Sequence, residues 1–340
     1  MAQAARELHG VDPNDIPYQQ LFDANEPVIL KGVVGHWPMV QAGLASTRSG
    51  MDFLLQNYNG KPATVYVGEP EIEARFAYNE QCTGFNFRAE TVTLNDVFSR
   101  IANGMGTQSH PYYYINSLLL NEAFPSIDSS NSLAFNHPEF ASSKQIAKVW
   151  IGTQSRASAH YDIPKNIACC VMGRRRFTLF PPSQVSNLYP GPLSPTPGGQ
   201  VITMVDLKAP DYDKFPRFKQ AEQHAVIADM EPGDALYYPS MWWHEVEAKD
   251  AFNVMVNYWW INAPRYMGNP LDVLMHAMLE LRGRSDAEKA AWRELFDYYI
   301  FGDEAQVTEH LPEACQGLLA ELDDNTARRL RAQLQRSLNR

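Results

Sequence analysis

A His-x-Asp triplet ends the stretch Val149-Trp-Ile-Gly-Thr-Gln-Ser-Arg-Ala-Ser-Ala-His160-Tyr161-Asp162. In an extended strand, residues i and i+2 point to the same face and lie about 6.6–7 Å apart along the chain. The imidazole of His160 and the carboxylate of Asp162 can therefore converge on one ion. Two ligands do not complete a metal site, so a third must come from elsewhere in the chain.

The best candidate for the third ligand is His244. It ends the segment Glu231-Pro-Gly-Asp-Ala-Leu-Tyr-Tyr-Pro-Ser-Met-Trp-Trp-His244, which reads as a turn, a short strand and an aromatic lead-in. Two histidines and one aspartate on one face of a metal, with open positions left, form the facial triad of non-haem Fe(II) oxygenases. We predict that His160, Asp162 and His244 bind a metal. The alternative is a hydrogen-bonded His–Asp pair and a separate core histidine.

Short strands separated by turn residues fill the middle of the chain. The strand candidates are residues 110–120, 149–162, 166–173, 174–180, 225–230, 235–238 and 253–260. Many short strands at such spacing predict a mainly β protein with a barrel or a sandwich at its centre. Flanking helices are expected at 51–58 and 93–101, where apolar residues recur with helical spacing.

A hairpin is predicted from 166 to 180, with Gly173 in its turn and Pro181-Pro182 ending its second strand. Alternation from Phe177 and Leu179 places Arg175 on the inward face of that strand. A buried arginine needs an anionic partner, so we expect Arg175 to bind one. The alternative is a surface turn arginine. Eight prolines between 181 and 216 indicate an ordered covering loop rather than a linker.

The C-terminal region changes to helical periodicity. Asn269-Pro270 supplies a helix start, and Ser285-Asp-Ala-Glu288 reads as a capping box that opens the next helix. The two helices carry wide apolar stripes as far as Tyr299. Because one face of each helix is enough to cover a barrel, we expect the remaining apolar surface to join two copies as a homodimer.

The amino-acid composition indicates which kinds of binding partner and which cellular location to expect. Of 340 residues, 45% are hydrophobic, and 29 basic against 39 acidic residues give a net charge of −10. This balance argues against general binding to nucleic acids or acidic membranes. The four cysteines show no Cys-x-x-Cys spacing, and we expect no signal peptide and no membrane-spanning segment. The predicted location is the cytoplasm.

Several segments match a known family in order and at nearly its spacing over about 110 residues. They are Trp150-Ile-Gly, Ala159-His-Tyr-Asp162, Asn166, Gly173, Leu179-Phe-Pro-Pro182, Asp211-Tyr-Asp-Lys-Phe-Pro-Arg-Phe, Pro232-Gly-Asp234, Trp242-Trp-His244 and Val256-Asn-Tyr-Trp259. In these segments the chain resembles the Jumonji-C and cupin-like oxygenases that depend on Fe(II) and 2-oxoglutarate. Within that family it is most similar to the asparaginyl hydroxylases of hypoxia-inducible factor.

The resemblance implies a role for each matching position. His160, Asp162 and His244 correspond to the iron ligands. Arg175 stands where this subgroup has a lysine that binds the distal carboxylate of 2-oxoglutarate; the forked guanidinium of arginine can hold a carboxylate bidentately, so the exchange changes the geometry but keeps the function available. Tyr114 resembles the tyrosine that shares this carboxylate.

Two further positions match asparagines of the family, and two positions differ from it. Asn166 and Asn257 resemble the asparagines beside the proximal end of the co-substrate. Ala157 replaces a threonine that helps to bind the co-substrate. Cys170 replaces a glutamine beside the substrate of the asparaginyl hydroxylases. Tyr112 is the alternative to Tyr114, since both lie on the same face of one expected strand.

The implied fold is a double-stranded β-helix, a jelly-roll or cupin barrel, with a C-terminal helical dimerisation region. Its expected parts are a mixed N-terminal flank at 1–110, the barrel at 111–262 and the helical region at 263–340. The implied reaction uses Fe(II), 2-oxoglutarate and O₂ to hydroxylate a C–H bond of a protein side chain or small molecule, and releases succinate and CO₂. A different metal-dependent cupin enzyme and a non-catalytic cupin-like binding protein remain alternatives.

Overall fold

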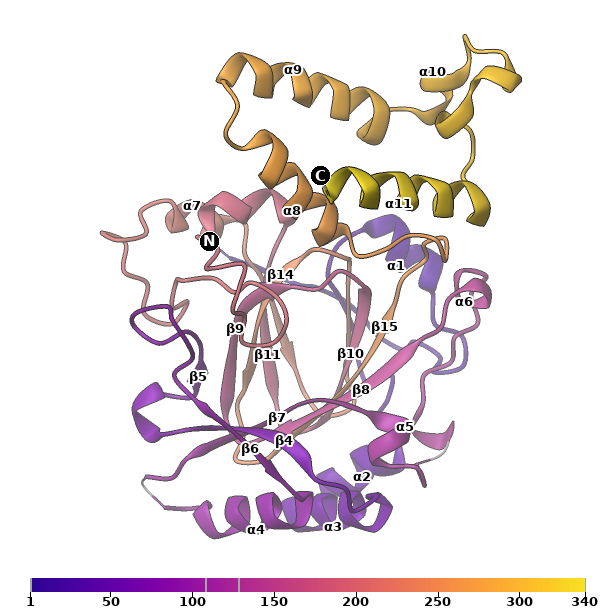
Figure 1. Ribbon diagram of the computed structural model, residues 1–340. Helices are drawn as coiled ribbons and strands as arrows, with labels where there is room; N and C mark the ends of the chain where they lie inside the picture. The colour runs from indigo at the N-terminus through magenta and orange to yellow at the C-terminus, as the bar shows by residue number, and fades with distance from the viewer. Residues whose placement is uncertain (1, 108, 128, 340) are drawn as a thin grey trace. The chain divides into compact units, whose positions relative to one another are not determined.

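The chain forms two compact units, residues 1–262 and 263–340. A computed structural model describes residues 2–107, 109–127 and 129–339 (Figure 1). No helix among these residues is long and apolar enough to cross a membrane. The boundary between the units coincides with the expected start of the C-terminal helical region.

Eight strands at the centre of the first unit are divided equally between two sheets, as in a double-stranded β-helix. One sheet contains the order β12-β11-β14-β9 and the other contains β13-β10-β15-β8. Their bounds are β8 Ile146–Gly152, β9 Ser155–Tyr161, β10 Lys165–Met172, β11 Arg175–Phe180, β12 Val226–Met230, β13 Ala235–Tyr238, β14 Trp243–Ala248 and β15 Asn253–Trp260. The expected mainly β fold with flanking helices is confirmed.

Residues 1–119 add strands to both sheets, and helices lie outside the sheets. The full sheets have six strands, in the order β1-β12-β11-β14-β9-β5, and nine strands, in the order β2-β3-β13-β10-β15-β8-β7-β4-β6. The additional strands are β1 Gln3–Ala4, β2 Arg6–Leu8, β3 Val28–Leu30, β4 Ala63–Gly68, β5 Arg75–Phe76, β6 Arg88–Val92 and β7 Tyr112–Leu119. The helices of this unit are α1 Tyr18–Ala24, α2 Pro38–Ala45, α3 Thr47–Asn57, α4 Leu94–Gly104, α5 Leu120–Ala123, α6 Glu139–Ser142 and α7 Phe218–Gln223.

The predicted hairpin between β10 and β11 is wrong. Strand β10 pairs with β13 and β15, whereas β11 pairs with β12 and β14 in the other sheet. The turn residue was placed correctly, because Gly173 has φ +69° and a Cβ there would lie 2.3 Å from Oδ1 of Asn253. This turn carries the chain from one sheet to the other. Alternation and a turn glycine define two strands but do not define their hydrogen-bonding partners.

Two apolar cores hold the first unit together. The larger core packs helices α2, α3 and α4 with the outer face of the nine-stranded sheet. The second core lies between the sheets and includes Cys170, Phe177, Leu236 and Met255. The nine-stranded sheet therefore buries apolar side chains on both of its faces.

Helices make up the second unit. They are α8 Pro270–Leu281, α9 Asp286–Phe296 with the π turn η4 Asp297–Phe301, α10 Glu304–Thr308 and α11 Asp324–Leu338. The Asn269 N-cap and the Ser285–Glu288 capping box form as predicted, and each satisfies backbone N–H groups that a helix start leaves free. Leu318 and Leu319 fall in a short 3₁₀ turn rather than in an α-helix.

Candidate metal centre

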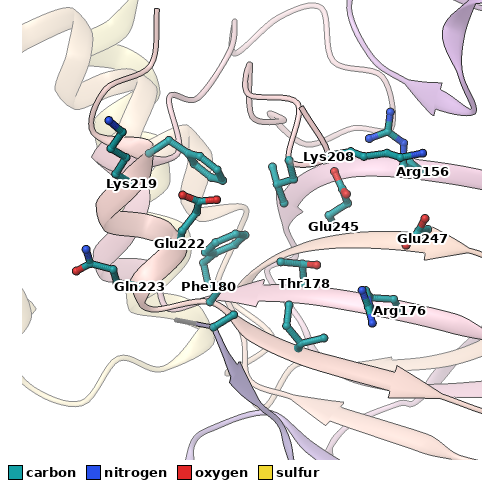
Figure 2. A pocket seen from close by; sticks show the side chains of 15 residues that line it. Arg156, Arg176, Thr178, Phe180, Lys208, Lys219, Glu222, Gln223, Glu245 and Glu247 are labelled. Carbon is teal, nitrogen blue, oxygen red and sulfur yellow. The ribbon is translucent and has the colours of Figure 1, made fainter. Parts of the chain in front are cut away.

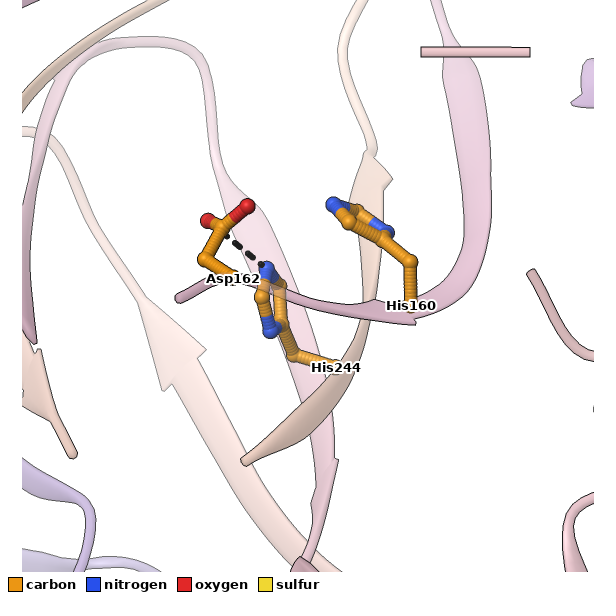
Figure 3. A group of neighbouring side chains, drawn as sticks. All are labelled: His160, Asp162 and His244. Carbon is orange, nitrogen blue, oxygen red and sulfur yellow. Dashed lines mark ion pairs between the residues drawn. The ribbon is translucent and has the colours of Figure 1, made fainter. Parts of the chain in front are cut away.

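His160, Asp162 and His244 lie together between the two sheets (Figure 3). One ligand atom from each lies within 4.8 Å of the other two. Nε2 of His244 is 3.6 Å from Oδ2 of Asp162, and the centroids of the two imidazole rings are 4.4 Å apart. The structure therefore brings the three predicted ligands to one point.

A β-bulge in β9 aims His160 into the space between the sheets. His160 pairs directly with His244, but the next pairing along the ladder joins Ala157 to Val246. Ser158 and Ala159 thus lie opposite the single residue Glu245. The extra residue changes the alternation, so that Ala157 and His160 both line the central cavity. Bulges next to active sites commonly re-aim a side chain in this way.

Backbone carbonyls orient both imidazoles. Nδ1 of His160 is 3.0 Å from the carbonyl oxygen of Ser158, and Nδ1 of His244 is 3.0 Å from that of Trp242. Because a carbonyl only accepts hydrogen bonds, Nδ1 donates in each pair. Nε2 of each ring is then unprotonated and available as a metal ligand.

A chain of side-chain hydrogen bonds holds Asp162. Nδ2 of Asn166 donates to Asp162 (3.2 Å), Nδ2 of Asn257 donates to Asn166 (3.3 Å), and Nε1 of Trp150 donates to Asn257 (2.5 Å). These residues come from β8, β10 and β15, so three strands fix one carboxylate. Asn166, which bonds directly to Asp162, is fully buried. Asn257 lines the central cavity.

Burial shifts the pKa values of Asp162 and His244. It raises the pKa of the Asp162 carboxyl, against the opposing effects of His160 and the hydrogen bond from Asn166. Burial, together with His160, lowers the pKa of the His244 imidazole well below its ordinary value. His244 is therefore neutral at pH 7, as a metal ligand must be.

Arg175 reaches the same central cavity, as predicted. It is 4% exposed, its Nε has no hydrogen-bond partner, and no carboxylate forms an ion pair with it among the described residues. Burial lowers the pKa of its guanidinium, while Cys170 and Tyr114 act in the opposite direction. Tyr114 also lines this cavity, whereas Tyr112 lines a different pocket. A buried cation without a counter-ion is costly, so an anion in this cavity would stabilise the guanidinium.

A second cavity, here called the aromatic cavity, adjoins the central one and shares His160 and Asp162 with it. Its walls include Tyr66, Phe76 and Phe87, which the sequence analysis did not select. They lie on β4, on β5 and just before β6, far from the triad along the chain. The alternation in Thr64-Val-Tyr-Val was the available signal for Tyr66. Residues 197–202 of the covering loop close the opposite side.

A pocket of about 700 Å³ lies on the outer face of the six-stranded sheet, with α7 as its other wall (Figure 2). None of the triad residues lines it. Its arginines are neutralised: Arg156 donates to Asp206 (2.6 Å) and Arg176 donates to Asp229 (2.6 Å). Burial raises the pKa of Glu245 in this pocket to about 7. The pairing of Arg156 with Asp206 ties the covering loop to β9, which gives these charges a structural role.

Comparison with known proteins agrees with this geometry. The model of the cupin-like domain matches residues 13–266, which is most of the chain. The chain belongs to the cupin-like domain family. The family resemblance is therefore confirmed, while placement beside the asparaginyl hydroxylases stays a prediction. Cupin-like and Jumonji-C proteins generally use Fe(II) and 2-oxoglutarate, and the His-His-Asp group of this cupin-like chain suits that use.

Three relatives show how far the similarity extends. The chain is 32% identical to lysine-specific demethylase JMJ31 of Arabidopsis thaliana over 39% of its own length and 24% of that protein. It is 24% identical to lysine-specific demethylase 8 of Xenopus tropicalis over 69% of its length and 48% of that protein. It is 25% identical to tRNA wybutosine-synthesizing protein 5 of Mus musculus over 72% of its length and 74% of that protein. The chain thus spans less than half of the two demethylases.

Proposed function

We propose that this cupin-like protein is an Fe(II)- and 2-oxoglutarate-dependent oxygenase that hydroxylates a C–H bond. One observation carries the proposal: the buried, unpaired guanidinium of Arg175 lines the same cavity as His160, Asp162 and His244. A metal triad needs a ligand for its open positions, and the guanidinium needs an anion. A small dicarboxylate satisfies both requirements at once.

The residues present fit the two absent groups. His160, Asp162 and His244 would hold Fe(II), since two neutral imidazoles and one carboxylate are the donors of a facial triad. Arg175 and the hydroxyl of Tyr114 would bind the far carboxylate of 2-oxoglutarate. When bound, Fe(II) and 2-oxoglutarate supply the oxidising chemistry: O₂ gives one oxygen atom to the substrate and one to succinate, and CO₂ is released.

The protein itself orients these groups and excludes water. Asn166 holds the Asp162 carboxylate in place, and the backbone carbonyls fix both imidazoles. Aliphatic and aromatic side chains, including Val246, Met255 and Tyr238, line the rest of the central cavity. A dry cavity strengthens the attraction between Arg175 and a carboxylate.

The alternative functions, a different metal-dependent cupin enzyme and a non-catalytic binding protein, do not explain the site as well. A cupin enzyme without a co-substrate has no need for a buried, unpaired guanidinium beside its metal. A non-catalytic binding protein does not need three correctly oriented ligands. We propose a protein side chain or a small molecule as the oxidised substrate.

The adjacent arginines provide a matched test. Arg175→Met should raise the Kd for 2-oxoglutarate at least a hundredfold, because truncating a buried charged pair costs about 3–5 kcal/mol. Arg174→Met makes the same chemical change at an exposed residue paired with Asp250, and should leave this Kd unchanged. Calorimetry with anaerobic Fe(II) enzyme measures both constants, and succinate release measures turnover. Equal 2-oxoglutarate affinity in the two variants would contradict the proposal.

A further inference from the structure

Aromatic rings form a continuous wall of the aromatic cavity, beside the triad. The wall consists of Tyr66, Phe76, Phe87, Tyr114, Trp150 and Trp259. Adjacent rings have centroids 4.7 to 6.4 Å apart from the first of them through to the last. Rings at these distances pack against one another and present flat faces to whatever enters.

Two residues that line the cavity each have one buried polar atom with no hydrogen-bond partner among the described residues. These atoms are the acceptor Oε1 of Gln200, from the covering loop, and the donor Nε1 of Trp259, from β15. The comparable N–H of Trp150 is already used, since it donates to Asn257. An unpaired buried donor or acceptor destabilises the folded protein, so these two atoms indicate a ligand that carries both complementary groups.

The charges around this cavity disfavour a cationic ligand. Asp162 is the one carboxylate among the described lining residues, and it is a proposed metal ligand. With Fe(II) and dianionic 2-oxoglutarate in place, the charges of Asp162 and Arg175 bring the total to zero. Lys148 then adds a positive charge, and its Nζ already lies 4.3 Å from the centre of the Trp259 ring. A second cation would meet repulsion and an occupied aromatic face.

We propose that the aromatic cavity binds the group to be oxidised, and that this group is an uncharged aromatic ring with a hydrogen-bond donor and an acceptor at its edge. This inference rests on the proposed oxygenase function, because it assigns the substrate of that site. The ring stacks on the aromatic wall. Its donor binds the carbonyl of Gln200, and its acceptor receives the indole N–H of Trp259. The cavity volume of about 70 Å³ argues against a large ligand.

Three small molecules test separately what the aromatic ring, the hydrogen-bond donor and a positive charge contribute to binding in the aromatic cavity. Benzamide carries the ring, donor and acceptor, methyl benzoate lacks the donor, and choline is a cation that aromatic cages bind. Their binding is measured by saturation-transfer NMR on the full chain loaded with Zn(II), which has no redox chemistry, and 2-oxoglutarate. We expect benzamide to bind at least tenfold more tightly than choline. Failure of benzamide to bind, or tighter binding of choline, overturns the inference, and the second result indicates a cation cage instead.

A glutamine variant tests the orientation of the bound ring. Gln200→Met keeps the side-chain length but removes the acceptor, so it should weaken benzamide binding about three- to tenfold and leave methyl benzoate unchanged. Gln220→Met makes the same change at an exposed position on α7 and should affect neither probe. An equal loss for both probes in Gln200→Met would mean that the residue only packs, which overturns the assignment.

The two proposals fail in different ways. If 2-oxoglutarate binds independently of Arg175, the oxygenase function is wrong whatever the probes do. If 2-oxoglutarate depends on Arg175 but choline binds more tightly than benzamide, the function stands and the substrate assignment falls.

Discussion

Asp162 is the one carboxylate of the proposed metal centre. It is buried at the end of β9, so its charge must be stabilised by the protein or by a bound cation. Asn166 supplies one hydrogen bond, and Asn257 and Trp150 hold Asn166 in turn. Partners of this kind orient a metal ligand without touching the metal. The hydrogen-bond chain therefore predicts that metal affinity depends on residues outside the triad.

Replacement of Asn166 by Ala tests this dependence. The variant should bind Fe(II) about 10–100-fold more weakly, since loss of such a supporting hydrogen bond typically has this effect. Asn253→Ala is the control, because Asn253 is equally buried on β15 but bonds to the backbone of Asp250. Anaerobic Fe(II) titration gives the affinities, and thermal unfolding reports stability separately. Equal metal affinity in the two variants would remove the positioning role from Asn166.

Replacing a residue of the triad itself should weaken Fe(II) binding more than replacing Asn166. Asp162→Ala removes the one anionic ligand, and Fe(II) binding should fall below detection at micromolar protein. Asp206→Ala serves as the comparison, because that aspartate pairs with Arg156 away from the metal centre. Anaerobic calorimetry compares them. Unchanged Fe(II) affinity in Asp162→Ala would show that the site is not a metal centre.

At residue scale, local spacing was enough to select the triad and Arg175. The His-x-Asp triplet and the alternation from Phe177 report which way neighbouring side chains point. Even so, the bulge in β9 that completes the geometry has no local signature. The alternation around Tyr66 predicted a strand but not its place at the site, and Phe76 and Phe87 had no local signal, because all three reach the site only through the pairing of distant strands in the folded chain.

At the scale of the elements, charges on the outer face of the six-stranded sheet tie its strands together. Asp229 on β12 accepts hydrogen bonds from Arg176 on β11 and from Lys249 just after β14. These bonds outweigh burial and lower the pKa of Asp229 to about 2. The folded state thus favours the ionised carboxylate, and one aspartate links three neighbouring segments.

Asp229→Asn should show how much this link contributes. A carboxyl with a lowered pKa stabilises the fold above its ordinary pKa of 3.8, and the contribution disappears as the pH falls through about 2. Because Asp229 is half exposed, we expect a loss of only about 1 kcal/mol at pH 7. Urea unfolding from pH 7 down to pH 3 should show the difference from wild type shrinking below pH 4. Asp213→Asn, at an exposed site on the covering loop, should show no such trend, and a constant difference for Asp229→Asn would refute the assignment.

Strand positions could be predicted more fully than strand partners. The bounds expected for β13 and β15 agree with the structure, because turn residues flank clear apolar runs. The predicted pairing of β10 with β11 failed, because the chain crosses from the nine-stranded sheet to the six-stranded sheet between these two strands. The N-terminal strands were also hard to assign to a sheet, because β3 joins the sheet by pairing with the distant strand β13, and β2 joins it by pairing with β3.

At the scale of the whole molecule, the second unit exposes many large apolar side chains. They are Val273, Leu274, Met275, Leu279, Trp292, Leu295, Tyr298, Tyr299, Ile300 and Phe301, from α8, α9 and η4. Soluble monomers rarely expose so many apolar side chains on consecutive elements. We propose that this surface joins two copies of the chain, because a self-complementary helical patch closes as a two-fold dimer.

Charge substitution on this surface gives the decisive measurement. The double variant Leu279→Glu/Phe301→Glu changes two residues that are 72% and 73% exposed, so neither supports the fold of its own unit. We expect light scattering to report a dimer for the wild type at micromolar concentration and a monomer for the variant, because burying two carboxylates in an apolar interface is costly. Leu44→Glu, at a 57% exposed leucine on α2, should remain dimeric. A monomeric wild type would defeat the proposal outright. A dimeric double variant would move the interface away from α8 and η4.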